Sequence, residues 1–143
     1  MIGIITALVS GALMSIQGVF NTEVTKQSGL WVSTSWVQFS ALIISLAIWF
    51  FTGRESMSTL VQVEPKYLLL GGVIGTFITV TVIQSMGSLG PAQAAILILI
   101  SQLAVAYLIE LFGLFGMEKQ PFLWRKVIGM VIAVGGLVLF RWE

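Results

Sequence analysis

Five apolar stretches follow one another along this 143-residue chain, and each is long enough, or nearly so, to cross a lipid bilayer. A helix needs ~20 mostly apolar residues to span the hydrocarbon, so five spans leave only short connections. The sequence therefore predicts an all-α integral membrane protein, a single five-helix domain over residues 1–143. The expected spans are residues 1–20, 30–51, 67–86, 91–112 and 124–142.

The fifth stretch is the weakest, because its uninterrupted apolar run covers only residues 127–140. Trp124 and Lys126 before this run and Trp142 after it are residues that anchor helix ends at the membrane surface. If the stretch crosses, the number of spans is odd and the two termini lie on opposite sides. A second copy can then be inverted relative to the first, as in the repeats of transporters.

The composition supports a membrane protein, with 57% hydrophobic and 9% charged residues. The chain has no Cys and no His, which excludes a disulfide, a thiolate or imidazole metal site and a His-centred triad. We therefore expect no metal, no cofactor and no enzymatic activity. A net charge of +1 with scattered basic residues also predicts no nucleic-acid partner.

The basic residues predict the orientation, because Lys and Arg are enriched in cytoplasmic loops. In the five-span arrangement five of them fall on the side of the N-terminus and two on the other side, so the N-terminus is expected in the cytoplasm. This difference favours one fixed orientation over dual insertion, and a fixed orientation calls for an oppositely oriented partner. The five are Arg54, Lys66, Lys119, Arg125 and Lys126, and the two are Lys26 and Arg141.

The spans carry a few polar residues, and lipid offers these no hydrogen bonds, so they should face another helix or a watery cavity. In the first span, Ser10, Gln17 and Asn21 fall on one face at helical spacing, and charged residues Glu23 and Lys26 are expected in a turn after it. Each of the next three spans also has one polar face. These faces carry Ser35, Gln38, Ser45 and Trp49, then Thr76 and Gln84, then Gln102, Ala106 and Glu110.

Two interpretations of these residues stay open. Gln17, Asn21, Trp36, Gln38 and Gln102 are candidates for lining a solute cavity, but buried amides also hold helices together, worth about 1 kcal/mol each. The small residues fit helix packing better than ligand contact. They are Gly71 and Gly75 on the third span and Gly129 and Ala133 on the fifth.

Glu110 is the one acid that could reach the bilayer interior. An ionisable group there is a candidate for ion coupling, as a proton acceptor or a cation partner. The alternative is an interfacial carboxylate at the end of its helix, close enough to water to stay charged.

Several of these residues occur in an order that resembles the YdcZ-type family of the drug/metabolite transporter superfamily. The resemblance covers nearly the whole chain and is most specific in Ser101, Gln102 and Leu103, followed by residues 110–116 (ELFGLFG). Two positions depart from the family pattern, Glu110 in place of the usual Asp and Gln120 in place of a basic residue. Weaker matches are Gly11, Gln17, Gly18, Asn21, Gly90, Pro91, Pro121, Gly129, Gly135 and Gly136.

The resemblance implies a bacterial inner-membrane location and an antiparallel pair of five-helix units, with a second copy or an oppositely oriented paralogue as partner. It also implies a relation to the small multidrug resistance exporters, whose first helix carries a central Glu. This chain places Gln17 in that region, which favours neutral or zwitterionic solutes over hydrophobic cations.

The function expected from the residues and the resemblance is that of a transporter subunit. It would move a small polar or amphipathic solute by alternating access through a cavity at the dimer interface. The alternative is a membrane scaffold or accessory subunit that transports nothing, in which the polar stripes serve packing alone.

Overall fold

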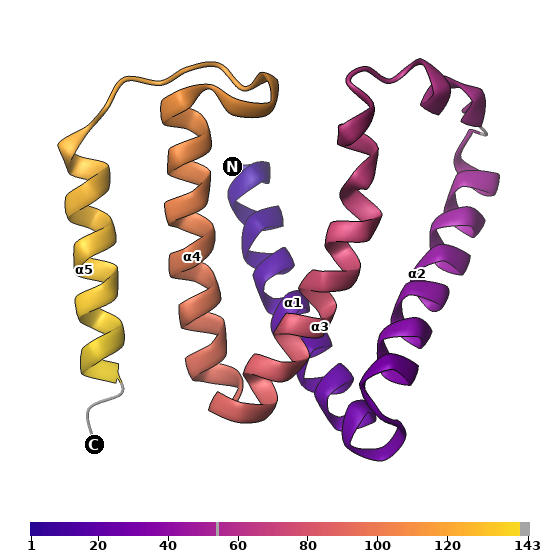
Figure 1. Ribbon diagram of the computed structural model, residues 1–143, viewed down its shortest axis with the longest axis horizontal. Coiled ribbons are helices and arrows are strands. Elements are labelled where there is room, and N and C mark those ends of the chain that lie inside the picture. Colours follow the sequence, from indigo (N-terminus) through magenta and orange to yellow (C-terminus); the bar gives the residue numbers. More distant parts are fainter. Residues whose placement is uncertain (54, 141–143) are drawn as a thin grey trace. The chain divides into compact units, whose positions relative to one another are not determined.

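The computed structural model describes residues 1–53 and 55–140, and all regular secondary structure within them is helical. Arg54, Arg141 and Trp142, which entered the predictions of orientation and anchoring, lie outside the described residues. Three short 3-10 segments, η1 to η3, accompany five α-helices (Figure 1). In chain order the elements are α1 Ile2–Ser28, α2 Leu30–Thr52, η1 Met57–Gln62, η2 Lys66–Leu70, α3 Gly71–Leu89, α4 Pro91–Phe112, η3 Leu114–Gly116 and α5 Trp124–Phe140.

Four helical segments of the described chain are long and apolar enough to cross a membrane: α1, α2, η2 continued by α3, and α4. These agree with the first four expected spans. Helix α5 begins at the expected Trp124 but has only 17 residues. The predicted all-helical membrane class is supported, whereas a fifth crossing and an antiparallel dimer stay predictions.

Glycines separate the helices where the chain must turn sharply. Gly29 ends α1 with a φ of 94°, and Gly90 separates α3 from α4 with a φ of 83°. Both values lie in a region that side chains with a Cβ avoid. Pro91 follows at the first position of α4, where the missing amide hydrogen costs nothing.

One local prediction was wrong: Glu23 and Lys26 do not form a turn. They lie inside α1, which continues to Ser28, and the Lys26 ammonium lies 2.5 Å from the Glu23 carboxylate. No Gly or Pro interrupts the chain after the apolar run until Gly29. Charged residues three apart support each other on a helix, so the polar segment extends the helix beyond its apolar part.

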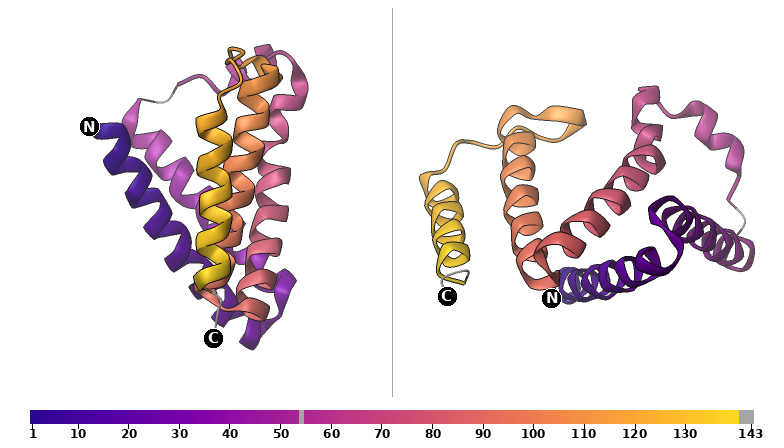
Figure 2. Two further views of the ribbon diagram at one scale, coloured as in Figure 1. Left: turned by 90° about the vertical axis from the view of Figure 1, so that its left-hand side faces the viewer. Right: turned by 60° about the horizontal axis from the view of Figure 1, so that its bottom comes forward.

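The chain divides into two compact units, and the first comprises Met1–Ser88. Helix α1 leads through a tight turn into α2 (Figure 2), and the Ser33 hydroxyl donates to the Asn21 carbonyl across that turn. Helix α3 contacts α1 where Gly18 faces the side chain of Met86. The buried side chains of this unit lie in the C-terminal halves of α1 and α3 and at the start of α2. They are Thr22, Ser33, Thr34, Val80, Ile83 and Met86.

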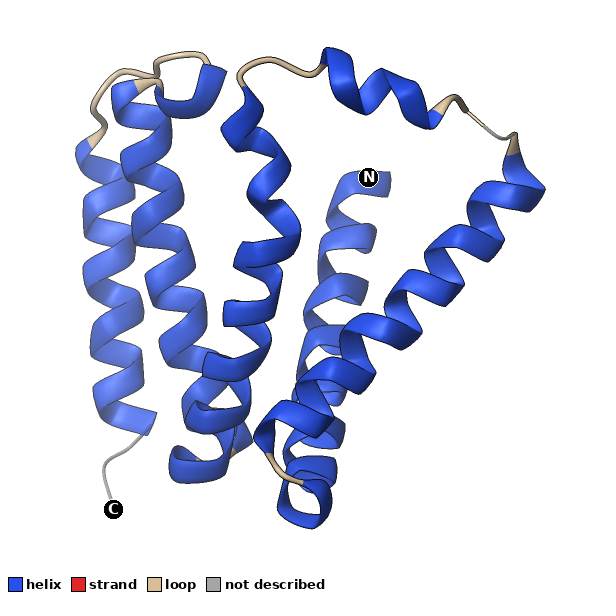
Figure 3. Cartoon of the chain, turned by 45° about the vertical axis from the view of Figure 1, so that its right-hand side comes forward, coloured by secondary structure: helices blue, strands red, loops and turns tan. Residues whose placement is uncertain are grey.

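The second unit begins at Leu89 and is described to Phe140. Helices α4 and α5 run side by side in opposite directions (Figure 3). The segment between them folds back onto the end of α4. The backbone N–H of Gln120 donates to the backbone carbonyl of Glu110 at 2.8 Å, and the backbone N–H of Leu123 donates to the Tyr107 hydroxyl at 3.0 Å. Tyr107 and Leu137 are buried within this unit.

Candidate functional site

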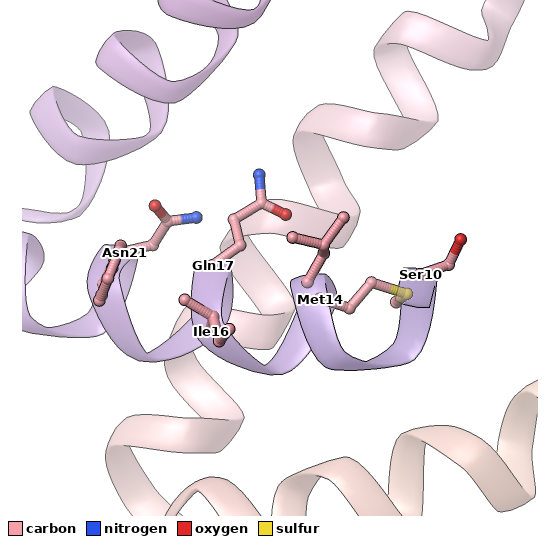
Figure 4. Close-up of a pocket in the computed structure, with 7 residues that line it drawn as sticks. Ser10, Met14, Ile16, Gln17 and Asn21 are labelled. Atoms are coloured by element: carbon pink, nitrogen blue, oxygen red, sulfur yellow. The ribbon is translucent and has the colours of Figure 1, made fainter. Parts of the chain in front are cut away.

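The polar stripe expected on the first span forms one side of helix α1. The amides of Gln17 and Asn21 project from the same side of the helix as the hydroxyl of Ser10 (Figure 4). Gln17 is exposed and Asn21 is half-buried. The spacing of these residues in the sequence therefore predicted correctly that their side chains share one face of the helix.

A groove lies between α1 and α2, with a volume of about 600 Å³, and we call it the α1–α2 groove. It brings together three of the candidate residues, Gln17, Asn21 and Trp36. Hydroxyls from Ser40 and Ser45 on α2 share the groove with apolar side chains. The remaining lining residues are Phe20, Val24, Val37, Ala41 and Ile44.

The described lining of the α1–α2 groove offers hydrogen bonds without charge. Its polar groups are amides, hydroxyls and the indole of Trp36, and none of its lining side chains is ionisable. The amides can donate and accept, whereas the Ser40 and Ser45 hydroxyls already donate to carbonyls of α2 and offer acceptors to a ligand. Such a surface suits a ligand that presents both donors and acceptors beside an aromatic or apolar face.

Trp36 stands at the edge of this groove. Its side chain is 62% exposed and also lines a second hollow on α2, and its ring lies 6.3 Å from the ring of Phe39. The indole is thus accessible from outside the first unit. A ligand or a neighbouring helix could contact its face.

Gln38 points to a different neighbour from the other candidates on this unit. Its side-chain amide donates to the Thr79 hydroxyl of α3 at 3.4 Å, a long contact, and the same hydroxyl donates to the Gly75 carbonyl at 3.0 Å. The polar face expected on the second span is likewise divided. Ser35 and Ser45 line different grooves, and the Trp49 indole donates to the Glu55 carbonyl.

Gln102 lies exposed on α4, in the second unit, and lines none of the grooves described here. The predicted packing residues Gly71, Gly75 and Gly129 have open space beside them: an added Cβ would meet nothing within 4 Å. Ala133 is also exposed. Within its own unit, none of these glycines packs closely against another element, so the role of these positions in packing stays a prediction.

Glu110 forms an ion pair that was not predicted from the sequence. Its carboxylate lies 2.6 Å from the ammonium of Lys126, which stands 5.2 Å from the centre of the Tyr107 ring. Both charged side chains are about 40% exposed. The pair bridges the end of α4 and the start of α5, so Glu110 sits at a helix end in contact with a cation.

The contact between Lys126 and Glu110 was not predicted from the sequence, although Lys126 entered the prediction of orientation. The short connection from α4 to α5 was the available signal, since it returns the chain close to the end of α4. Phe20 and Ser40, which line the α1–α2 groove, were also not predicted as site residues. Phe20 lies three residues after Gln17, a spacing that places two side chains on neighbouring positions of one helix face.

A family model described as "Putative inner membrane exporter, YdcZ" matches residues 2–139. No curated protein and no solved structure is a significant match. Because the match extends over nearly the whole chain, the chain belongs to the YdcZ family, and its long apolar helices agree with the membrane location in the family's description.

Proposed function

We propose that this protein is one subunit of an inner-membrane transporter that moves a small polar or amphipathic solute by alternating access. The observation that carries the proposal is the gathering of Gln17, Asn21 and Trp36 in one groove of an otherwise strongly apolar unit. Polar groups at membrane depth are costly unless they face a partner, water or a solute. Membership in an exporter family supports solute binding as their role.

The α1–α2 groove is open on one side, and this favours a partner subunit. Ile5, Leu8 and Leu13 on α1 are each more than half exposed. In a membrane these side chains would face lipid or another chain, but the groove beside them needs a cover to hold a solute away from lipid. We propose that a second copy or a paralogue in the opposite orientation supplies this cover, as the odd number of spans would allow.

The lining of the groove bears on the class of solute. Since the described lining has no ionisable side chain, a solute with a net charge would lose hydration without gaining a counter-charge. Neutral or zwitterionic molecules with a ring that stacks on Trp36 fit this surface best.

Ion coupling is proposed for Glu110, with Lys126 as a competitor. A proton or a cation that binds the carboxylate competes with the ammonium that lies 2.6 Å away. Binding and release would then open and close the contact between α4 and α5.

A thermal-stability screen tests the proposed function. We would reconstitute the protein in lipid nanodiscs and measure its melting temperature with aromatic solutes of similar size that are neutral, zwitterionic or cationic. A ligand at ~100 times its Kd stabilises the folded state by about 2.7 kcal/mol. We expect stabilisation by members of the first two classes, and its loss in Gln17→Ala and Asn21→Ala.

Gln84→Ala is the matched control, because it removes an exposed amide from α3 that lines none of the grooves described here. It should keep the response to solutes. Stabilisation that survives in both Gln17→Ala and Asn21→Ala would refute the site. A chain that no solute stabilises, and that transports none in vesicles, would instead be a scaffold or accessory subunit.

A further inference from the structure

A second groove lies between α4 and α5 and ends at the Glu110–Lys126 ion pair. We call it the α4–α5 groove; its volume is about 390 Å³. Apart from the ion pair, the described residues that line this groove are mainly apolar. The lining residues are Leu103, Ala106, Tyr107, Glu110, Lys126, Gly129 and Met130.

The charged end of this groove lies where a lipid head group would be. Glu110 is near the C-terminal end of the membrane-length helix α4, and Lys126 is in the first turn of α5. Trp124, which is 71% exposed and contacts the ring of Phe122, also lies at the start of α5, close to Lys126 in the sequence. Aromatic residues and helix ends of this kind are typical of the membrane–water interface.

The apolar part of the groove extends from that level along both helices. Leu103 lies seven residues before Glu110, which corresponds to about 10 Å along the helix. Gly129 widens the groove, because space is open where its side chain would be. A slot of this form suits part of an acyl chain, directed from the interface toward the bilayer centre.

The charges of the groove select the head group. One carboxylate and one ammonium cancel, so an anion would be attracted by Lys126 and repelled by Glu110. A zwitterion can satisfy both groups at once. The carboxylate has a second oxygen that can accept a hydrogen bond, and the ammonium has three donors, of which one is directed to Glu110.

We propose that the α4–α5 groove is a binding site for phosphatidylethanolamine. The lipid phosphate contacts Lys126, its primary ammonium donates to Glu110, and one acyl chain lies along Leu103, Ala106 and Gly129. The ammonium with its N–H donors distinguishes this lipid from phosphatidylcholine, which has the same charges but no such donor. The site is separate from the α1–α2 groove and does not depend on the proposed transport function, although a bound lipid would compete with a coupling ion for Glu110.

Native mass spectrometry of the purified protein tests the head-group preference. The probes are phosphatidylethanolamine, phosphatidylcholine and phosphatidylglycerol with identical acyl chains, added in equal amounts. A half-exposed charge-assisted contact is worth up to ~1 kcal/mol, so we expect about five-fold tighter binding of phosphatidylethanolamine. Glu110→Gln should reduce this preference over phosphatidylcholine to about one.

A matched pair of substitutions tests the location. Gly129→Leu fills the groove and should lower the occupancy of phosphatidylethanolamine several-fold. Gly135→Leu is the control, because it makes the same change on α5 at a position with open space that is not part of the groove lining. Equal binding of the three lipids to the wild type would overturn the proposal, as would equal lipid occupancy in the two leucine variants.

Discussion

Gly18 shows how one residue controls the contact between two helices. A Cβ at this position would lie 2.5 Å from the sulfur of Met86 and 3.2 Å from a methyl of Val82. We expect Gly18→Val to lower the free energy of unfolding by about 1 kcal/mol, because the terminal atoms of the buried Met86 side chain have to move out of the space that the added methyls take. Thermal unfolding in detergent would measure the effect.

The same helix provides a control for this prediction. Gly11 also lies in α1, but an added side chain there meets nothing within 4 Å, so Gly11→Val should leave the melting temperature nearly unchanged. Met86→Ala should restore part of the stability lost in Gly18→Val, since it removes the atoms in conflict. Equal melting temperatures for the two valine variants would contradict this prediction and show that the Met86 side chain moves aside without cost.

At the scale of an element, α5 decides how many times the chain crosses the membrane. Its 17 residues correspond to about 26 Å of helix, a few ångströms less than the ~30 Å hydrocarbon core. A mismatch of this size costs little when flanking residues anchor the ends or the bilayer thins. We therefore expect α5 to cross.

Cysteine labelling can test this crossing, because the natural chain has no Cys. We would introduce Gln120→Cys before α5 and Glu143→Cys at the chain end, which lies beyond the described residues. If α5 crosses, a membrane-impermeant maleimide should label Glu143→Cys in intact cells and Gln120→Cys in inverted vesicles, because the loop that contains Gln120 is predicted on the cytoplasmic side. Labelling of both from the same side would place α5 on the membrane surface and make the number of spans even.

For the whole molecule, the basic residues predict how the chain sits in the membrane. Ser28→Cys and Ser56→Cys place labels at exposed positions, one at the end of α1 and one after α2. If α2 crosses the bilayer, the two labels lie on opposite sides. The excess of Lys and Arg on the side of Ser56 predicts that an impermeant reagent added to cells reaches position 28 alone.

That result would call for an oppositely oriented paralogue as the partner. Labelling of both positions in cells would contradict a fixed orientation and indicate dual insertion, in which case two copies of this chain can form the antiparallel pair. Either partner is compatible with an open α1–α2 groove, since each can supply the missing wall.

The sequence by itself determined the helices and the family. Runs of apolar residues make helices wherever the chain enters a membrane, and Gly29, Gly90 and Pro91 mark their ends through local backbone preferences that need no tertiary contact. The resemblance based on Gln102 and residues 110–116 is confirmed by the family match over residues 2–139. The turn expected at Glu23 was wrong because helix propensity and an ion pair extend α1 beyond its apolar run.

The tertiary structure alone decided which neighbours the polar residues meet. Gln17 and Gln38 are both amides inside apolar helices, yet one lines a groove and the other contacts Thr79. Glu110 and Lys126 are 16 residues apart and meet only because the chain folds back after α4. Helical periodicity gives the direction of a side chain from its own axis, but which neighbour it reaches depends on how two helices cross, and packing at positions such as Gly18 sets that crossing.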